Sequence, residues 1–415
     1  MVDSEDARPG PLAGLRVLDI SSFIAAPAAA VVLGDWGADV IKIEGPDGDP
    51  NRRIMHDSSN YPKSPVNYPW EMDSRNKRSI VLDLKQEAAR AALDRLIAQA
   101  DVLICNFPPL VREKLKLAYD DVKSVNPRLI YASLTGYGEQ GPDRDRPGFD
   151  ATAYFARSGL LDAQRYEGGP PGVPGPAQGD RATAMTLVSA ILMALMHRQK
   201  TGEGSWVGTS LLGNGLWSCG VIAQAALVGA FLGARPPPER PRSALGNIYR
   251  TSDDRWLQLT IVRTDKLWAP LCQALERPEL IDDPRFSLNA KRVENYAATV
   301  KIVQDWLDST KDDEDALALM DEHRVPAAPV LSVEQAVNHP HLRGRRTVRT
   351  IKDRIMPDFD IPGVPLKFSQ FPEELPLQAP LLGEHNGEIL TSYLGYSAER
   401  IKQLEGDGVL YQQNI

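Results

Sequence analysis

Short apolar runs alternate with helical segments through the first 160 residues, and this alternation constrains the fold more than any other feature. The run at 15–21 (LRVLDIS) is followed by a helical stretch at 26–37 and a second apolar run at 38–44 (ADVIKIE). The pattern continues at 79–85, 86–100, 101–107 and 127–136. Near-continuous apolar strands alternating with helices are typical of a mostly parallel sheet covered on both faces. The sequence therefore predicts an α/β fold.

Such a fold often binds dinucleotides, and Glu44 ends the second apolar run, where an acid that binds ribose would lie. The turn after the first run, however, is SSFIAAP (21–27) and contains no GxGxxG. Without these glycines a pyrophosphate cannot closely approach the helix N-terminus. The sequence therefore disfavours a dinucleotide-dependent dehydrogenase.

Proline-rich passages divide the rest of the chain, whose 415 residues favour two domains. A helical region at 181–233 is followed by the breaker ARPPPERPRSALGN at 234–247. Two β-like runs at 249–261 flank a turn, and helical patterns then continue to the Pro-punctuated 325–332. The predicted parts are a large α/β domain from 1–220, a linker at 221–247, a small α+β domain at 248–325, and a linker with return to the large domain at 326–415.

Composition argues against several functional classes. The net charge of −8 disfavours nucleic acid as the main partner. Cys105, Cys219 and Cys272 lack metal-ligand spacing and favour a reducing, cytoplasmic location, and no metal site is expected. The longest apolar runs, at about 183–196 and 220–233, are shorter than the ~18 residues of a membrane span, so no membrane partner is expected.

Asp180 opens an almost wholly apolar helical stretch, GDRATAMTLVSAILMALMHRQKTGEG (179–204). An aspartate at this position can cap the helix, which contributes about 1 kcal/mol. It can also do chemistry. The residues alone leave both interpretations open, and the cap is the simpler one.

Several segments, in this order, resemble the family III CoA-transferases (the CaiB/BaiF, formyl-CoA transferase-like family), which include carnitine and bile-acid CoA-transferases and the α-methylacyl-CoA racemases. They extend from residue 11 to about 390: PLAGLRVLDIS, GADVIKIEGPDGD, NKRSIVLDLK, ADVLICNFPP, NPRLIYASLTGYGEQGP, GDRATAMTLVSAILMALMHRQKTGEG, VPAAPVLS and APLLGEHNGEIL. The resemblance implies a large domain whose mostly parallel, Rossmann-like sheet is formed by both chain ends, a small inserted domain, and an interlocked homodimer.

The resemblance also implies an activity: CoA moves from an acyl-CoA to a carboxylic acid, with no permanently bound cofactor. Asp180 would be the nucleophile, and a helix dipole would keep it ionised near neutral pH. The racemases pair this aspartate with a histidine, where PGFD places Phe149. Two acid/base groups are needed to exchange an α-proton, so transferase is favoured over racemase. A third possibility is a CoA-binding subunit of a heteromeric transferase.

The site residues carried over from the family fall into two groups. The CoA-binding group is Ile24, Ala25, Leu82, Asp83, Leu84, Lys85, Asn106, Phe107, Pro108, Lys114, Gly148, Phe149 and Asp150. The substrate-binding group is Ile24, Phe149, Gly246 and Asn247. Two alternatives stay open: Lys85 and Lys114 could belong to solvated helix faces, and Phe149 could be a core residue.

The chain departs from the formyl-CoA transferases at three places. It has Ile24 where they have glutamine and Gly45 where they have arginine. The segment RSALGNIY (242–249) stands where they have a glycine-rich loop. An apolar Ile24 in place of an amide suggests an acyl group larger and less polar than formate or oxalate.

Overall fold

The computed structural model describes residues 10–231, 233–237, 239–371 and 377–412, which form two compact units. The larger unit comprises the described parts of Met1–Ala163, Gly172–Leu232 and Gly344–Ile415. The smaller unit comprises the described parts of Gln164–Pro171 and Gly233–Arg343. The larger unit is therefore assembled from segments on both sides of the smaller one in the sequence.

A six-stranded sheet forms the centre of the larger unit, and each neighbouring pair of strands is parallel. The strand order is β3-β2-β1-β4-β5-β6, which is the order of doubly wound dinucleotide-binding folds. The strands are β1 (Arg16–Ile20), β2 (Asp39–Glu44), β3 (Lys77–Val81), β4 (Val102–Cys105), β5 (Ile130–Thr135) and β6 (Ser205–Ser210). The predicted mostly parallel, Rossmann-like α/β sheet is confirmed.

The structure contains a strand where the sequence predicts a continuous helical region at 181–233. Its residues Ser205–Ser210 form β6, which pairs in parallel with β5 at the edge of the sheet. The segment reads SWVGTS and has no buried residue, so it lacks the continuous apolar run that marks β1 and β5. An edge strand with one neighbour gives a weaker sequence signal than a central strand.

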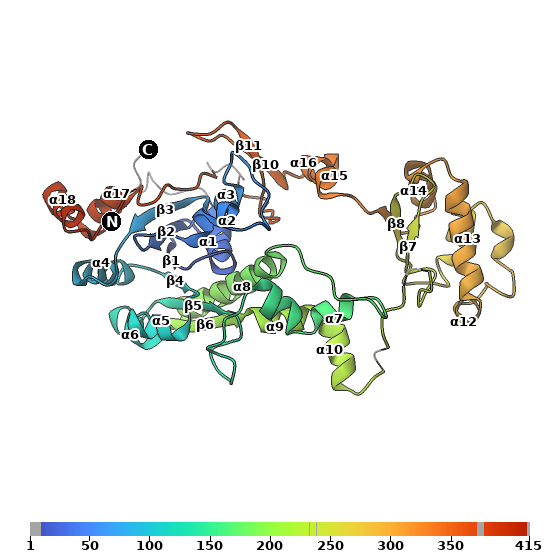
Figure 1. The fold of residues 1–415 in the computed structure, drawn as a ribbon, viewed down its shortest axis with the longest axis horizontal. Helices are drawn as coiled ribbons and strands as arrows, with labels where there is room; N and C mark the ends of the chain where they lie inside the picture. The colour runs from blue at the N-terminus through green and yellow to red at the C-terminus, as the bar shows by residue number, and fades with distance from the viewer. Residues whose placement is uncertain (1–9, 232, 238, 372–376, 413–415) are drawn as a thin grey trace. The chain divides into compact units, whose positions relative to one another are not determined.

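Alternate residues of β1 point to opposite faces of the sheet. Val17 contacts a core formed with α1 (Ala25–Asp35) and α8 (Gln178–Thr201), and every residue of α1 is buried. The two helices pack against each other across this face, as Figure 1 shows. This packing places the N-terminal ends of both helices beside the sheet.

The opposite face carries a second core, in which Leu18 and Ile20 pack against helix α4 (Glu87–Ile97). The C-terminal helices α17 (Asn386–Leu394) and α18 (Ala398–Gly406) cover the same face beside β3 and α4 (Figure 1). The sheet itself is not formed by both chain ends as expected, because its strands all lie within residues 16–210 and the C-terminal end contributes helices.

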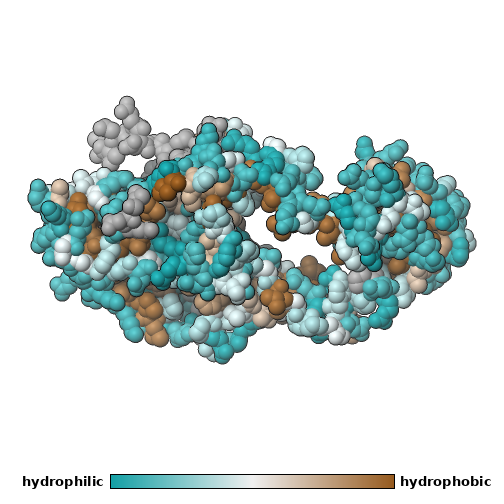
Figure 2. Space-filling view, turned by 45° about the horizontal axis from the view of Figure 1, so that its top comes forward, coloured by the Kyte–Doolittle hydropathy of each residue, from teal (hydrophilic) through white to brown (hydrophobic). Residues whose placement is uncertain are grey.

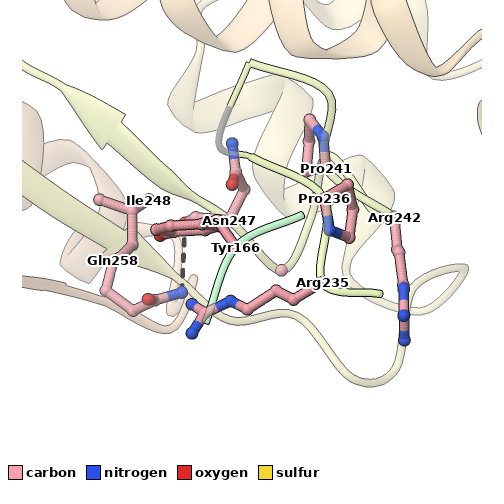
Figure 3. A pocket seen from close by; sticks show the side chains of 9 residues that line it. Tyr166, Arg235, Pro236, Pro241, Arg242, Asn247, Ile248 and Gln258 are labelled. Atoms are coloured by element: carbon pink, nitrogen blue, oxygen red, sulfur yellow. Dashed lines mark hydrogen bonds between the residues drawn. The ribbon is translucent and has the colours of Figure 1, made fainter. Parts of the chain in front are cut away.

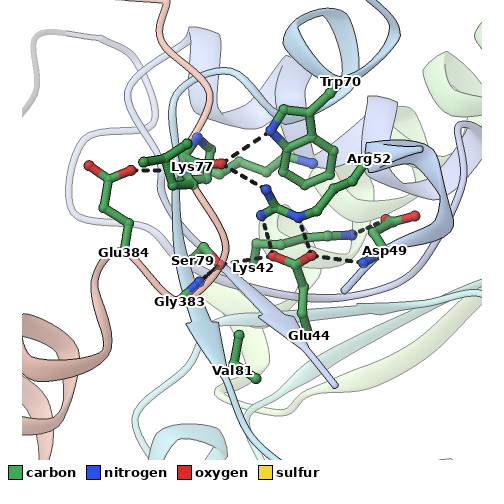
Figure 4. Close-up of polar contacts among 12 residues, drawn as sticks. Lys42, Glu44, Asp49, Arg52, Trp70, Lys77, Ser79, Val81, Gly383 and Glu384 are labelled. Atoms are coloured by element: carbon green, nitrogen blue, oxygen red, sulfur yellow. Dashed lines mark hydrogen bonds and ion pairs between the residues drawn. The ribbon is translucent and has the colours of Figure 1, made fainter. Parts of the chain in front are cut away.

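Polar contacts tie the C-terminal segment to the N-terminal strands, as Figure 4 shows. Glu44 accepts hydrogen bonds from Arg52 Nε at 2.8 Å and from Ser79 Oγ at 2.8 Å. The Gly383 N–H in turn donates to Ser79 Oγ at 3.0 Å, and Arg52 donates to the Pro380 carbonyl at 3.1 Å. Glu44 thus serves the fold, which gives a physical reason why it is not a ribose-binding acid.

Shorter elements complete the larger unit. Before β6 they are η1 (Pro50–Arg52), α2 (Ile54–Asp57), α3 (Tyr68–Ser74), α5 (Pro109–Lys114), α6 (Tyr119–Val125), the π-helix η2 (Asp150–Ala156) and α7 (Leu160–Gln164), whose last residue is assigned to the smaller unit. After β6 they are α9 (Leu211–Ser218), α10 (Gly220–Leu227) and the antiparallel pair β10 (Val348–Ile351) and β11 (Phe359–Pro362).

Helix α8 is longer than the apolar run that predicts it, with 24 residues. It is the one helix in the described ranges that is long and apolar enough to cross a membrane, by length and composition alone. Buried core helices meet the same criterion, and Leu187, Val188 and Ile191 of α8 lie in the core beside α1. The three cysteines are free and buried.

The smaller unit is built on an antiparallel three-stranded sheet in the order β7-β8-β9. The two runs predicted around Asp253–Asp254 are β7 (Ile248–Arg250) and β8 (Trp256–Leu259), and Asp254 takes a left-handed conformation with φ of 66° in the turn. Strand β9 (Ala327–Pro329) lies beyond the predicted end of the small domain at 325 and completes the sheet. The accompanying helices are α11 (Trp268–Ala274), η3 (Pro278–Leu280), α12 (Asn289–Glu294), α13 (Tyr296–Ser309), α14 (Asp313–Glu322), α15 (Val333–Asn338) and α16 (Pro340–Gly344), whose last residue is assigned to the larger unit.

Glu71 is a buried carboxylate on α3 whose charge the fold does not compensate. Its side chain is 6% exposed, and Oε2 has no hydrogen-bond partner in the described structure. Burial, with Asp353 nearby, raises the pKa of Glu71 to about 7, against smaller opposing effects of the Ala379 N–H, Arg354 and Arg52. The folded state therefore holds a proton that the unfolded chain has lost, and stability falls as the pH rises from about 4.5 to about 7.

We therefore expect Glu71→Gln to stabilise the protein at pH 8 by about 2 kcal/mol and to have little effect at pH 4.5. Urea unfolding of both proteins at the two pH values measures this difference. Glu405→Gln, on the surface of α18, is the control and should change neither value. Equal unfolding free energies of wild type and Glu71→Gln at pH 8 would contradict the assignment.

Candidate active site

A cavity of about 270 Å³ lies at the carboxyl ends of β1, β4 and β5 in the larger unit. This is the edge of a parallel sheet at which doubly wound folds bind their ligands. Asp180 lines the cavity, and so do seven of the other predicted site residues: Ile24, Ala25, Asn106, Phe107, Pro108, Gly148 and Phe149.

The turn after β1 forms one wall and is held in a strained conformation. Phe23 has a left-handed φ of 63°, which is costly for an aromatic residue and is typically maintained at functional sites. Its N–H donates to Asp49 Oδ1 at 3.0 Å. Asn106, after β4, accepts from the Ser22 N–H at 2.9 Å and donates to the Ser22 carbonyl at 2.8 Å. Asn106 therefore fixes this turn as well as lining the cavity.

Two aromatic rings meet at the mouth of the cavity. Phe149 is 57% exposed and packs edge-on against Phe23, with ring centroids 5.5 Å apart. Because the ring is largely exposed, the alternative of a core phenylalanine is wrong. Gly148 precedes it at a close backbone approach, since a Cβ there would lie 2.7 Å from the Tyr137 ring.

Asp180 is the third residue of α8, whose N-cap is Ala177, so Asp180 is not the cap residue. Burial raises the pKa of Asp180 to about 7, and the carboxylates of Asp150 and Asp73 add to the effect, whereas Arg181 opposes it. With this pKa the carboxylate is partly ionised near neutral pH, whereas a helix dipole alone would keep it fully ionised. Desolvation and two neighbouring negative charges act against ionisation.

A second layer of charged groups surrounds Asp180. Asp73 is buried on α3 and pairs with both terminal nitrogens of the Arg181 guanidinium, one of them at 3.0 Å. Because Arg181 is bound to Asp73, it does not neutralise Asp180. Burial also raises the pKa of Tyr61, and the charges of Asp180 and Asp73 add to that rise.

Some predicted CoA contacts do not line this cavity. Leu82 is buried in the core that contains α4, which is a structural position. Asp83 accepts from the Lys85 N–H at 3.2 Å in the turn after β3, while the side chains of Lys85 and Lys114 are exposed. Leu84 packs against the same core as Leu82. Asp150 lies one residue beyond the lining and contacts α8 instead.

Gly246 and Asn247, the predicted substrate contacts, line a different cavity of about 190 Å³ within the smaller unit. Figure 3 shows Tyr166, Arg235 and Gln258 around it. Gln258 Nε2 donates to the Asn247 carbonyl at 3.2 Å, the dashed line in the figure. The residues that the sequence assigns to one substrate site therefore lie in two different units of the structure.

The structure also adds lining residues that sequence reasoning missed. Arg144 and Arg146 line the Asp180 cavity, on a loop rich in charged residues that carries no recognisable motif. Arg144 pairs with Asp145 at 3.3 Å and Glu113 at 3.7 Å, and Arg146 pairs with the partly exposed Asp143 at 3.0 Å. Both arginine side chains are themselves exposed. Surface pairs of this kind are weak, so both guanidinium groups are available to an anionic ligand. The run DRDR beside the PGFD motif was the available signal.

The cavity thus brings together a desolvated carboxylate, apolar walls and two arginines, which suits a carboxylate nucleophile acting on a phosphate-bearing ligand. Comparison with known proteins decides the family, because the model of CoA-transferase family III matches residues 12–386. The chain belongs to CoA-transferase family III. It is an enzyme of the CoA-transferase type, and CoA or acyl-CoA is its substrate.

Curated relatives match over nearly the whole length of this family III chain. The (R)-2-hydroxy-4-methylpentanoate CoA-transferase of Clostridioides difficile is 31% identical, covering 96% of this chain and 99% of the relative. The succinyl-CoA–L-malate CoA-transferase beta subunit of Chloroflexus aurantiacus is 34% identical, covering 96% and 98%. The cinnamoyl-CoA:phenyllactate CoA-transferase of Clostridium sporogenes is 32% identical, covering 95% and 96%.

Solved structures agree with this placement. A CaiB/BaiF family protein from Brucella suis superposes with a TM-score of 0.79 at 29% identity, covering 93% of this chain and all of that one. A protein of M. tuberculosis superposes with a TM-score of 0.78 at 29% identity, covering 91% of this chain and 99% of that one. The family III CoA-transferase resemblance seen in the sequence motifs is confirmed.

Proposed function

We propose that Asp180 carries the acyl and CoA groups during transfer from an acyl-CoA to a carboxylic acid. The observation that supports this is the position of its carboxylate, in a cavity with the apolar Ile24 and Phe149, while the adjacent Arg181 is paired with Asp73. A desolvated carboxylate is a stronger nucleophile once it has lost its proton. Acyl transfer between carboxylates requires such an acceptor on the enzyme.

In the first half-reaction an Asp180 oxygen attacks the thioester carbonyl carbon and the C–S bond breaks. This gives a mixed anhydride and CoA thiolate. The thiolate then attacks the Asp180 carbonyl carbon and expels the donor carboxylate, leaving an enzyme–CoA thioester. The acceptor carboxylate attacks this thioester, and the returning thiolate cleaves the new anhydride at the acceptor carbonyl. Asp180 is regenerated, and no proton is gained or lost.

The apolar lining supports a substrate acid with a hydrocarbon portion. Ile24, Leu134, Leu211 and the exposed ring of Phe149 line the cavity that contains Asp180. Three relatives are named for 2-hydroxy acids: 2-hydroxy-4-methylpentanoate, malate and phenyllactate. We therefore propose a medium-sized, partly apolar carboxylic acid as acceptor, with 2-hydroxy acids as the first class to assay.

Intact-mass spectrometry of the protein incubated with acyl-CoAs, including succinyl-CoA and acetyl-CoA, tests the proposal. We expect a CoA-sized adduct that maps to the peptide containing Asp180 and is absent from Asp180→Ala. Exchange of the substrate α-proton with solvent deuterium, with no adduct, would instead indicate a racemase. An adduct on another peptide would overturn the assignment of the nucleophile.

Arg144 and Arg146 are proposed to bind the phosphates of CoA, since guanidinium groups pair with phosphate oxygens through charge-assisted hydrogen bonds. We expect the double Arg→Ala variant to raise the KM for acyl-CoA about tenfold or more, with kcat little changed. The effect should shrink as the salt concentration rises. Arg285→Ala, an exposed arginine paired with Asp283 in the smaller unit, is the matched control. A double variant with unchanged KM would place the phosphates elsewhere.

We further propose that the chain forms a homodimer, interlocked as in the family it resembles. Figure 2 shows one face that is mostly hydrophilic with apolar patches. Large apolar side chains are exposed along α8, α9 and α10 and just after α10. These are Met193, Met196, Leu216, Trp217, Val221, Leu227 and Val228. An apolar surface of this extent is typical of an interface.

Light scattering on the purified chain tests the dimer, and an assay of the same fraction tests sufficiency. A dimer active alone supports a homodimer. Two relatives are named as alpha and beta subunits of a succinyl-CoA–L-malate CoA-transferase, so a dimer that is inactive until a second chain is added would indicate a heteromeric enzyme. The three buried free thiols support a reducing, cytoplasmic location as part of this proposal.

A further inference from the structure

The first turn of α8 is capped from another part of the chain. Its N-cap residue, Ala177, has a left-handed φ of 61° and no side chain able to cap. Asp150, at the start of η2, accepts a hydrogen bond from the Asp180 N–H at 3.0 Å. The backbone N–H groups of Ala177, Gln178 and Gly179 act on the same carboxylate by lowering its pKa. Asp150 therefore satisfies a donor that would otherwise lack an intrahelical partner.

This contact depends on a very close approach between η2 and α8. A Cβ on Gly179 would lie 2.4 Å from Asp150 Oδ1 and 2.2 Å from Tyr154 Cγ, so no residue other than glycine fits there without displacement. Asp150 begins a π-helix, a conformation found frequently at functional sites. In the first turn of α8, Gly179 thus leaves room for the Asp150 side chain, and Asp180 is the next residue.

The same contact places a second negative charge beside Asp180. Four charged or titratable groups act on the Asp180 carboxylate: Asp150, Asp73, Arg181 and Tyr61. Arg181 is bound by Asp73, so these two largely cancel. Asp150 remains the main uncompensated charge. Burial raises the pKa of Asp150 above its usual value, and the backbone N–H groups at the start of α8 oppose that rise. Burial and the nearby Asp150 carboxylate raise the pKa of Asp180 to about 7.

We propose that Asp150 is a positioning residue for Asp180: its carboxylate fixes the first turn of α8, and its charge strengthens the Asp180 carboxylate as a nucleophile. This inference rests on the proposed function of Asp180. The sequence assigned Asp150 to CoA binding, and the geometry points instead to a role through α8.

Two substitutions separate the cap from the charge. Asp150→Asn keeps a hydrogen-bond acceptor and removes the charge, so we expect the acid limb of the kcat/KM profile to move down by about one pH unit or more. Asp150→Ala removes both, and we expect kcat to fall about 10- to 100-fold with KM for acyl-CoA little changed, because the carboxylate is misplaced. Asp120→Asn, an exposed aspartate in the first turn of α6, is the control and should leave both unchanged.

A measurement independent of activity tests the role of Asp150 separately from the nucleophile role of Asp180. The carboxyl carbon of Asp180, assigned by its absence in Asp180→Ala, is titrated by NMR in wild type and Asp150→Asn. A titration midpoint that falls in Asp150→Asn supports the inference, and an unchanged midpoint overturns it. Full transfer activity in Asp180→Ala would overturn the proposed function instead, whatever the titration shows.

Discussion

Asp180→Ala is expected to reduce CoA transfer by about a thousandfold or more, because the residue that carries both groups between the half-reactions is lost. Among the described residues, no hydrogen bond joins its carboxylate to α8, and the Asp180 N–H in the first turn is bound by Asp150. The variant should therefore fold like the wild type and still bind acyl-CoA. Steady-state kinetics, a melting curve and a binding titration of the same preparation measure the three properties.

Asp180→Asn is the matched control for shape, because an amide fills the same volume but is a poor nucleophile. We expect it to be as inactive as Asp180→Ala. An Asp180→Asn protein that regains activity with time and gains one mass unit would show deamidation to aspartate, which also supports the nucleophile. Activity in both variants within tenfold of wild type would be incompatible with a covalent step at this position.

The pH dependence of the wild type follows from the same environment. Since burial, Asp150 and Asp73 raise the pKa of Asp180 to about 7, and since the ionised form attacks, kcat/KM should rise through about pH 7 and level off above it. An unperturbed aspartate would place this limb near pH 4.

Lys77→Met is expected to destabilise the larger unit by about 3–5 kcal/mol, because it removes one partner of a buried charge network. Lys77 Nζ is fully buried and donates to Asp19 Oδ2 at 2.8 Å, to the Pro27 carbonyl at 2.9 Å and to the Asp73 carbonyl at 2.7 Å. Burial raises the pKa of Asp19, but Lys42 and Lys77 together outweigh it and lower that pKa. Without Lys77, the Asp19 carboxylate keeps Lys42 at 3.7 Å and the Ser21 hydroxyl.

A loss of this size is a large fraction of the stability of a typical domain, so the soluble yield should fall as well. Lys402→Met, on the exposed face of α18, makes the same chemical change without burial and should be neutral. Urea unfolding of the soluble fraction gives the free energy, and expression tests give the yield if little soluble protein remains. Equal stability of the two variants would show that the network contributes nothing net.

The central strands could be predicted because their signal is local. Each of β1, β2, β4 and β5 is buried on both faces, so its sequence is an apolar run that ends at a turn. Strand β6 has one neighbour and no buried residue, and it was missed. The attachment of Gly383 to Ser79 joins residues more than 300 positions apart, and no local pattern encodes such a contact.

Site residues that lie in the turns after strands can be predicted from the sequence. The pKa of Asp180 cannot, because it depends on residues that only the fold brings close. Ile24 and Asn106 line the cavity because they lie in the turns that follow β1 and β4. The raised pKa of Asp180 depends on burial and on Asp150 and Asp73, which lie 30 and 107 positions away in the sequence, so it does not follow from the position of Asp180 in its own helix. Tertiary neighbours decide the charge state of a buried carboxylate more than its own helix does.

The late position of α17 and α18 in the chain has a consequence for biosynthesis. These helices supply Ile389, Leu390 and Leu404 to the core that also contains Ile80 of β3 and Leu93 of α4. Until these helices leave the ribosome, the face of the sheet that they cover keeps part of its apolar surface exposed. The segment that forms the smaller unit has by then already emerged. Contacts of such long sequence separation form slowly, and unfinished chains with exposed apolar faces tend to aggregate. Nascent chains that stall before residue 386 are therefore expected to need a chaperone, and the time needed to complete translation sets how long that need lasts.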